Sequence, residues 1–338
     1  MRVWCVGAGA IGGTVAARLA RAGVALRVID ANPEHVRRLR DPGLRLRSVD
    51  GHDVIPLPAD TPEAAADLLP SCDLLLLAVR SQATRAALAP LIGRLGPASD
   101  VVSLQNGLNE ETITELVGGE RTVGCVVGFG ATWHAPGDVE LTSSGELVIG
   151  RLDGALDERL VAVGELLARA FPTRTTPNIR GALWGKMLVN SVTVLGALGG
   201  LLFGELIDWN PAVLAHIVAE GVDVAAAEQV ELEPVFGLVP APLIARREAG
   251  WLETMTRALV AVGPHFARVK SVTWRDFELA RPSEIDAVTG EIVRRGRRRG
   301  VATPLNTAAL RMLQEIEARA RAIERTNLDT LAGLVPGA

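Results

Sequence analysis

A glycine-rich turn near the amino terminus constrains the fold of this 338-residue chain more than any other segment. The motif Gly7-Ala8-Gly9-Ala10-Ile11-Gly12 directly follows an apolar run and opens a stretch with helical periodicity. In such a strand–turn–helix the first glycine makes the tight turn, the second lets the backbone approach a pyrophosphate, and the third allows close helix–strand packing. The amide groups of the helix N-terminus then hold phosphate oxygens. We therefore predict a dinucleotide-binding loop formed by these six residues.

The first half of the chain alternates short apolar runs with amphipathic stretches. The runs at 2–6, 25–30, 73–79, 100–104 and 122–127 are predicted strands, and the stretches at 10–22, 81–95 and 109–117 are predicted helices. This order is typical of a parallel sheet with helices on both faces. The flanks of Val49-Asp50-Gly51 and of Ser144-Gly145 predict two hairpins, over residues 44–57 and 139–149.

Composition changes at residues 171–178, which are rich in proline, threonine and arginine and predict a linker. Beyond it, helical periodicity covers 179–194, 211–229, 241–262, 283–299 and 306–325, and residues 331–338 are predicted to be a loose tail. The expected fold is an α/β Rossmann-type N-terminal domain with a C-terminal all-helical domain. We place the dinucleotide-binding domain at 1–175 and the helical substrate and catalytic domain at 178–330.

Asp30, at the end of the second predicted strand, bears on the choice of dinucleotide. A carboxylate there accepts hydrogen bonds from the adenosine ribose hydroxyls and repels a 2′-phosphate, which favours NAD(H) over NADP(H). The alternative is that Asp30 simply caps the helix expected after Asn32-Pro33-Glu34. The nearby Arg37 and Arg38 add positive charge that works against the preference for NAD(H).

Two polar residues follow further predicted strands of the sheet. Arg80 follows the strand at 73–79, and Asn106 follows the strand at 100–104. Ligands of open α/β sheets bind at the carboxyl edge, where both residues are expected, so both are candidates for cofactor binding. Asn106-Gly107 is also an ordinary turn sequence, and its spacing alone favours that reading.

Lysine is scarce and tyrosine is absent. Of 35 basic residues only Lys186 and Lys270 are lysines. Arginine stays protonated, so proton chemistry by a tunable amine has only these two side-chain candidates. Lys186 and Asn190 are four residues apart and share one face of a predicted helix. Lys186 either snorkels from a core-facing helix or is partly desolvated, which makes its ammonium a better acid; we favour the second reading.

A short acidic segment begins the predicted helix at 283–299. Ser283 and Asp286 have the spacing of a capping box. Glu284 between them either complements the helix dipole or accepts a hydrogen bond from a substrate hydroxyl.

Four motifs follow one another in a fixed order over nearly the whole chain. They are the glycine loop, Gln105-Asn106-Gly107, Leu183-Trp184-Gly185-Lys186-Met187-Leu188-Val189-Asn190, and Arg281-Pro282-Ser283-Glu284-Ile285-Asp286 followed by Thr303-Pro304-Leu305-Asn306. Together they resemble the ketopantoate reductase (2-dehydropantoate 2-reductase) family. The resemblance implies hydride transfer from a nicotinamide, NADP(H) included, to the ketone of a small-molecule 2-oxo acid.

The same resemblance implies roles for four side chains. Lys186 would be the general acid that protonates the carbonyl oxygen, and Glu284 would orient the new hydroxyl. Asn106 would contact both nicotinamide and substrate, and Asn190 would line the substrate site.

The chain departs from the family at three positions that hold the substrate. Val194 and Phe203 stand where the family has asparagine, and Val272 stands where it has serine, unless a shift of register puts Ser271 or Thr273 there. An apolar or larger substrate suits Val194, Phe203 and Trp274 better. Ketopantoate is the default substrate, and the alternative is an NAD-dependent dehydrogenase of bulkier, D-mandelate-like 2-hydroxy acids. A third reading is a dinucleotide-binding sensor without turnover, against which the retained Lys186 and Glu284 argue.

Other features exclude further classes of function. The net charge of −4 does not favour nucleic acid, and the arginine-rich run at 294–300 is predicted to be a solvated helix end. No membrane anchor is expected, because the apolar stretch at 189–203 is interrupted and short. The five histidines show no metal-ligand spacing, and His134 is the one expected nearest the site. Three dispersed cysteines predict reduced thiols and a cytoplasmic protein, and a homodimer is left open.

Overall fold

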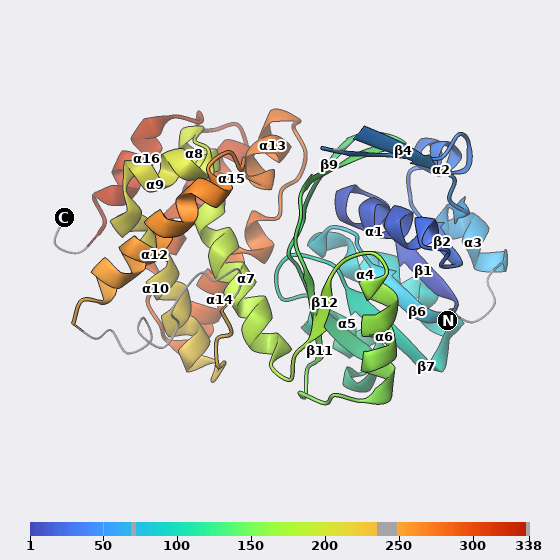
Figure 1. Cartoon of the computed structure of the whole chain (residues 1–338). Helices are drawn as coiled ribbons and strands as arrows, with labels where there is room; N and C mark the ends of the chain where they lie inside the picture. Colours follow the sequence, from blue (N-terminus) through green and yellow to red (C-terminus); the bar gives the residue numbers. More distant parts are fainter. Residues whose placement is uncertain (50, 69–71, 235–248, 336–338) are drawn as a thin grey trace. The chain divides into compact units, whose positions relative to one another are not determined.

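The computed structural model describes residues 1–49, 51–68, 72–234 and 249–335 (Figure 1). The chain forms two compact units, Met1–Ile179 and Arg180–Ala338, which are described separately. Part of the helix predicted at 241–262 lies outside the described residues, and the helix observed next to it is Trp251–Phe266.

The first unit is built from alternating strands and helices, as the sequence predicted. Its elements are β1 (Val3–Val6), α1 (Ala10–Arg21), β2 (Leu26–Ile29), α2 (Pro33–Arg40), β3 (Leu44–Ser48), β4 (Gly51–Ile55), β5 (Ala59–Asp60), α3 (Pro62–Leu68), β6 (Cys72–Leu77), η1 (Ser81–Ala83), α4 (Thr84–Leu88), η2 (Ala89–Arg94), β7 (Leu95–Ser103), α5 (Glu110–Val117), η3 (Gly119–Arg121), β8 (Thr122–Val127), β9 (Gly130–Ala135), β10 (Asp138–Ser143), β11 (Leu147–Arg151), α6 (Glu158–Ala168) and β12 (Thr173–Thr175).

The main sheet of this unit has the strand order β12-β11-β8-β7-β6-β1-β2-β5. The strands from β5 to β8 are parallel, and β11 joins β8 antiparallel. Successive side chains of a strand point to opposite faces. In β6, Leu74 and Leu76 therefore pack with α1 and α6, whereas Leu75 and Leu77 pack with α4 and α5. Burial on both faces explains why these strands are almost wholly apolar.

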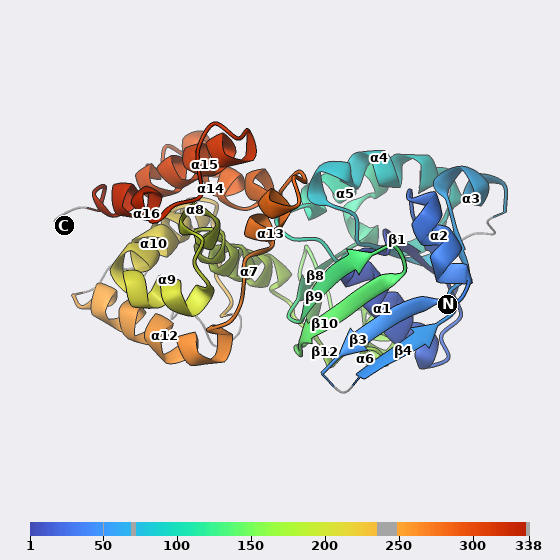
Figure 2. The same ribbon diagram turned by 90° about the horizontal axis from the view of Figure 1, so that it is seen from above.

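A second, four-stranded sheet with the order β4-β3-β10-β9 covers the outer side of α1 (Figure 2). The hairpin predicted at 44–57 is confirmed, since β3 and β4 pair antiparallel. The hairpin predicted at 139–149 is wrong, because β10 pairs with β9 and β3, whereas β11 belongs to the main sheet. Gly145 lets the chain pass between the sheets: a Cβ there would lie 2.2 Å from the Gly128 carbonyl oxygen.

Two further predictions in the first unit need correction. The helix predicted at 81–95 is broken into η1, α4 and η2. Pro90 in the first turn of η2 lacks an N–H and crowds the preceding turn, which ends the α-helix. Within the predicted linker at 171–178, residues of β12 pair with β11 as a short edge strand.

The described part of the second unit contains only helices. They are α7 (Ile179–Thr193), α8 (Gly196–Gly199), α9 (Phe203–Trp209), α10 (Pro211–Ala227), α12 (Trp251–Phe266), α13 (Val272–Glu278), η4 (Ile285–Ala287), α14 (Thr289–Arg299), α15 (Pro304–Glu317) and α16 (Arg325–Ala332). The α/β and all-helical classes predicted for the two halves are both confirmed.

Several helix boundaries of the second unit differ from the prediction. The helix expected from Ser283 starts only at Thr289, after a 3-10 turn, so Ser283 and Asp286 form no capping box. The helix expected to reach residue 325 ends at Glu317, where Arg319 takes a positive φ of 59°. The predicted loose tail begins inside α16, in which Leu331 is fully buried.

The arginine-rich end of α14 is only partly solvated, contrary to the prediction. Arg295 is 4% exposed and donates to Glu291 at 2.5 Å and to Glu228 at 3.1 Å. Its guanidinium also lies 5.9 Å from the centre of the Trp184 ring, on α7. Gly300 does end the helix as predicted, with a left-handed φ of 70°. Part of the arginine-rich run therefore belongs to an ion cluster around the buried Arg295.

One stretch, Ile179–Gly199, is long and apolar enough by length and composition to cross a membrane. The most apolar window of this stretch is 72% buried inside the protein, as expected for the core helix of a globular unit. The three cysteines, Cys5, Cys72 and Cys125, are free and buried.

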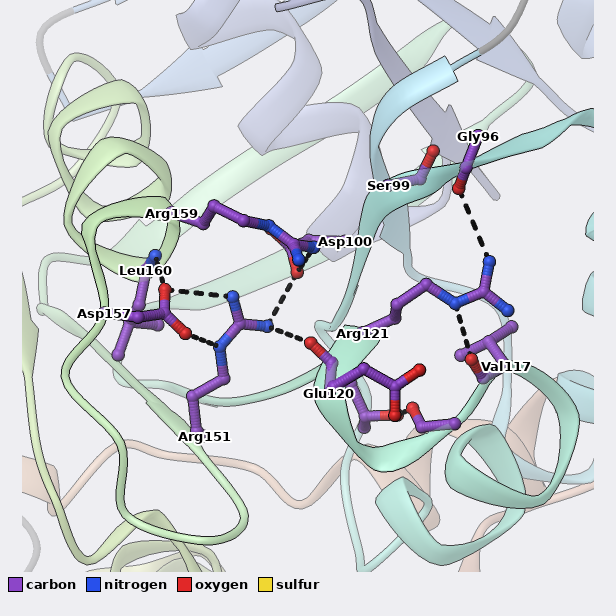
Figure 3. Close-up of polar contacts among 12 residues, drawn as sticks. Gly96, Ser99, Asp100, Val117, Glu120, Arg121, Arg151, Asp157, Arg159 and Leu160 are labelled. Atoms are coloured by element: carbon purple, nitrogen blue, oxygen red, sulfur yellow. Dashed lines mark hydrogen bonds and ion pairs between the residues drawn. The ribbon is translucent and has the colours of Figure 1, made fainter.

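An ion network centred on the buried Arg151 and Asp100 lies at the amino edge of the main sheet (Figure 3). The Arg151 side chain is 2% exposed; it donates to Asp100 at 2.6 Å, to Asp157 at 2.9 Å and to the Glu120 carbonyl oxygen at 3.1 Å. Arg159 also donates to Asp100, at 2.6 Å. These bonds join β7, β11 and the start of α6, because Asp157 caps that helix through the Leu160 amide.

We expect Arg151→Met to lower the free energy of unfolding by about 3 kcal/mol, because it leaves the buried carboxylate of Asp100 without one of its donors. Arg85→Met is the matched control: Arg85 and its partner Glu115 are 59% and 64% exposed, so its loss costs under about 1 kcal/mol. Urea unfolding of both variants measures the difference. Equal losses in the two variants would contradict a special role for the network.

Candidate functional site

The glycine loop has the backbone geometry that its sequence predicted. Gly7 has a φ of +88°, and a Cβ on it would lie 2.9 Å from the Val79 backbone nitrogen. Its N–H donates to the Ile29 carbonyl oxygen at 2.8 Å, which ties the turn to β2. A Cβ on Gly12 would lie only 2.0 Å from the Gly7 carbonyl oxygen. Both positions therefore require glycine for steric reasons alone.

Gly9 differs from its two neighbouring glycines. A Cβ on Gly9 would meet no described atom within 4 Å. Gly9 is also the N-cap of α1, and no side chain among the described residues caps this helix. The loop thus combines open space with an uncapped helix N-terminus, which suits the approach of a pyrophosphate to the backbone. Ala10 and Ile11 form the first turn of that helix.

Asp30 is attached directly to the loop. Its Oδ2 accepts a hydrogen bond from the Ala8 amide at 2.8 Å, and its Oδ1 accepts one from the Asn32 amide at 2.9 Å. The alternative that Asp30 caps α2 is wrong, because Asn32 caps it by accepting from Glu34 and His35. A carboxylate can accept about four hydrogen bonds, so Asp30 keeps lone pairs for other donors.

Three of the arginines near Asp30 in the sequence have carboxylate partners. Asp60, whose side chain is 3% exposed, pairs with both Arg27 and Arg40. Arg37 lies 3.8 Å from Glu34 on the same helix. Arg27 and Arg40 are therefore held by a buried carboxylate, whereas the contact between Arg37 and Glu34 is exposed and Arg38 belongs to none of these pairs.

The carboxyl ends of β6 and β7 are joined by side-chain hydrogen bonds. The Asn106 carbonyl oxygen accepts from the Ser81 hydroxyl at 2.9 Å and from the Asn109 amide at 2.6 Å. Gln105 donates to the Val79 carbonyl oxygen at 2.9 Å. Arg80, which precedes Ser81, and Asn106 are thus held at the same edge of the sheet, as predicted. Asn106-Gly107 is also a turn, since Gly107 has a φ of +89°.

Two residues in this region were missed by sequence reasoning, and Gln105 was recognised only as part of the motif Gln105-Asn106-Gly107. Asn109 had no signal beyond its place near Asn106. Glu110, in the first turn of α5, is buried, and burial raises the pKa of its carboxyl to about 7. An acid in the first turn of a helix ordinarily complements the dipole on the surface, so no sequence signal distinguished Glu110 from an exposed acid.

His35 was missed as well. The sequence placed His134 nearest to the site, but His134 lies on β9 and bonds to Glu140 at 2.7 Å. His35 is 2% exposed, and its Nε2 lies 2.8 Å from the Ala8 carbonyl oxygen in the glycine loop.

In the second unit, Lys186 and Asn190 lie one turn apart on the same face of α7, as predicted. Both side chains are half-buried, and the neighbouring Met187 and Leu188 are fully buried. Burial lowers the pKa of the Lys186 ammonium to about 8. Desolvation disfavours the charged form, so Lys186 is a stronger acid than an exposed lysine.

The other predicted residues of the second unit lie on separate elements. Glu284 is half-buried and directly precedes η4. Val194 and Phe203 are buried, after α7 and at the start of α9. Val272, at the start of α13, is 55% exposed. Among the described residues, no group of three or more His, Cys, Asp or Glu side chains could hold a metal ion.

Comparison with known proteins agrees with this arrangement. The family model described as "Ketopantoate reductase PanE/ApbA" matches residues 3–154, and its C-terminal counterpart matches residues 178–317. The chain belongs to the ketopantoate reductase family. It is 30% identical to the 2-dehydropantoate 2-reductase of Halobacterium salinarum over 312 residues, which cover 90% of this chain and 95% of that one. It is accordingly an oxidoreductase of this family.

Solved structures share the fold. A ketopantoate reductase of this family from Ralstonia eutropha superposes with a TM-score of 0.79 at 30% identity, covering 94% of this chain and 99% of that one. D-mandelate dehydrogenase, solved with NADH and anilino(oxo)acetate, gives 0.79 at 22% identity with the same coverage. A ketopantoate reductase from Staphylococcus aureus, described as dimeric, gives 0.74 at 17% identity and covers 95% of this chain and all of that one.

We expect Gly9→Ala to abolish dinucleotide binding with little change in stability. The added methyl group meets no described atom, yet it occupies the space through which a pyrophosphate approaches the backbone. Gly12→Ala is the contrasting variant, because its methyl group would clash with Gly7 and destabilise the fold. NADH fluorescence titration and thermal melting separate the two effects. Normal NADH affinity in Gly9→Ala would contradict the placement of the cofactor.

Proposed function

We propose that this chain reduces a 2-oxo acid to a 2-hydroxy acid with NAD(P)H, and that 2-dehydropantoate is its default substrate. The observation that supports this most directly is Lys186, an amine of lowered pKa one helical turn from Asn190. Residues 1–175 are proposed to bind the dinucleotide, and residues 178–330 to supply the substrate and catalytic side chains.

The nicotinamide, when bound, supplies the hydride that reduces the substrate ketone. The Lys186 ammonium donates a proton to the carbonyl oxygen as negative charge develops there. An acid with a pKa near 8 remains mostly protonated at pH 7, yet it gives up its proton more readily than an ordinary lysine. Glu284 accepts a hydrogen bond from the new hydroxyl, and Asn106 and Asn190 bind the substrate in the reactive orientation.

We propose NAD(H) as the preferred cofactor. Asp30 keeps acceptor sites for ribose hydroxyls, and its negative charge repels a 2′-phosphate. Arg27 and Arg40 are paired with the buried Asp60, so they are poorly placed to neutralise an added phosphate. NADP(H) is the alternative that follows from family membership.

A second candidate substrate is a bulkier 2-oxo acid of the D-mandelate type. Valine, phenylalanine and valine at positions 194, 203 and 272 cannot hydrogen-bond a substrate hydroxyl or carboxylate. An aromatic or branched substituent would find apolar contacts there. A dinucleotide sensor without turnover is disfavoured, because it has no need of a lysine with a lowered pKa.

The cysteines, the net charge and one relative bear on the location and the partners of the enzyme. The three cysteines are free and buried, which supports a reducing compartment and a cytoplasmic location. The net charge of −4 gives no support for nucleic acid as a partner. We propose a homodimer by analogy with the dimeric relative.

A panel of 2-oxo acids assayed with NADH and NADPH tests the activity. We expect turnover of 2-dehydropantoate or a bulkier analogue, and a loss of about 10²–10⁴-fold in kcat for Lys186→Ala with NADH binding retained. In the reductive direction kcat falls as pH rises through about 8, because the acid must be protonated. Lys270→Ala is the control, since that lysine pairs with Glu278 on the surface. Full activity of Lys186→Ala would overturn its assignment.

Replacement of Asp30 tests the cofactor preference. We expect Asp30→Asn to raise the ratio of kcat/KM with NADPH to that with NADH at least tenfold, about 1.4 kcal/mol, because the charge that repels the 2′-phosphate is lost. Asp53→Asn is the control, because Asp53 lies on β4 and pairs with Arg21 at the surface. A wild-type preference for NADPH would contradict the role given to Asp30.

A further inference from the structure

The buried side chain of His35 contacts two distant backbone segments of the first unit. Its Nε2 lies 2.8 Å from the carbonyl oxygen of Ala8, in the glycine loop. Its Nδ1 lies 2.8 Å from the amide nitrogen of Gly137, in the turn between β9 and β10. His35 itself is on α2, so one imidazole joins three parts of the chain.

These two contacts define the protonation of the ring. The Gly137 N–H can only donate, so Nδ1 accepts and carries no proton. Nε2 then carries the proton and donates to the Ala8 carbonyl oxygen. Both nitrogens of a neutral imidazole are satisfied, which suits a side chain that is 2% exposed.

The Ala8 residue is consequently held from both sides. Its N–H donates to the Asp30 carboxylate at 2.8 Å, and its carbonyl oxygen accepts from His35. Ala8 lies between Gly7 and Gly9, two residues that otherwise have wide conformational freedom. The two hydrogen bonds therefore set the peptide planes of the loop through which the pyrophosphate is proposed to bind.

The other side of the ring is equally constrained. Gly137 has a φ of +78°, and a Cβ on it would lie 2.7 Å from the Cβ of Arg38 on α2, so the turn packs closely against that helix. The Gly137 carbonyl oxygen accepts from the Arg45 amide at 2.8 Å, which connects the turn to β3. Trp133 contacts the imidazole edge-on, with ring centres 6.5 Å apart. The four-stranded sheet thus holds the ring in place.

We infer that His35 is a positioning residue for the dinucleotide: anchored by Gly137, it holds the Ala8 carbonyl and so keeps the amides of the glycine loop directed at the cofactor phosphates. This inference rests on the proposed dinucleotide site. The bond from Gly137 sets the tautomer of the ring, which makes Nε2 the donor to the Ala8 carbonyl oxygen.

Two variants separate the two hydrogen bonds of the ring. Asparagine places an acceptor near the position of Nδ1 but has no donor at the position of Nε2. Glutamine places a donor near the position of Nε2 and gives up the acceptor at Nδ1. His35→Asn should therefore lose the bond to Ala8 and keep the bond to Gly137, and His35→Gln should do the reverse.

We expect His35→Asn to raise the Kd and KM for NADH at least tenfold, with kcat at saturating NADH within about threefold of wild type. His35→Gln should keep the Kd for NADH within about threefold while its Tm falls. His134→Asn is the control for replacement of a histidine elsewhere in the unit, because His134 lies on β9 and bonds to Glu140. NADH titration, steady-state kinetics and thermal melting give the three readouts.

The outcomes distinguish the inference from the proposed function. If wild type binds neither NADH nor NADPH, both are overturned. If wild type binds NADH and His35→Asn binds it equally well, the positioning role fails and the function stands. If the affinity for NADH falls in parallel with the Tm in both His35→Asn and His35→Gln, the role of His35 is only structural. If His35→Asn does not fold, His35→Gln decides: retained affinity supports the role, and a tenfold loss overturns it.

Discussion

The close contact between Gly12 and the Gly7 carbonyl oxygen is the constraint on which the first unit depends. Because a Cβ at position 12 would lie 2.0 Å from that oxygen, α1 can start directly above the end of β1 only with glycine there. This contact places the helix N-terminus at the carboxyl edge of the sheet, and Asp30, Arg80 and Asn106 reach the same edge because parallel strands end together. The sterics of one turn thus determine where ligand chemistry can occur.

The paired arginines and Lys186 have separate roles in this chain. Arg151 and Arg295 are buried and paired with carboxylates, and Arg27 and Arg40 share Asp60, so arginine serves mainly to satisfy fixed negative charge. A guanidinium suits this role because it stays charged and presents several donors in one plane. Lys186 is the exception: it can release a proton, and burial brings its pKa toward neutrality.

Much of the fold could be predicted from the sequence, because strand and helix periods and the glycine motif are local signals. The errors arose where local and tertiary signals differ. The run at 139–149 looks like a hairpin, but which strand pairs with β10 is decided by packing over α1. Asp30, Lys186 and Asn190 were predicted because their residue types and their positions in predicted strands and helices can be read from the sequence. His35 was not, since its partners are backbone atoms 27 and 102 residues away.

The Arg151 network lies at the opposite edge of the sheet from the glycine loop. Asp100 is level with Leu74 and Val3, at the beginning of the parallel strands, whereas Gly7 follows their ends. The charges of this network are therefore remote from the residues proposed to bind the ligand. An enzyme built in this way can exchange residues at the edge of the glycine loop during evolution without weakening the Arg151 network. Such a division favours the diversification of substrate preference within one scaffold.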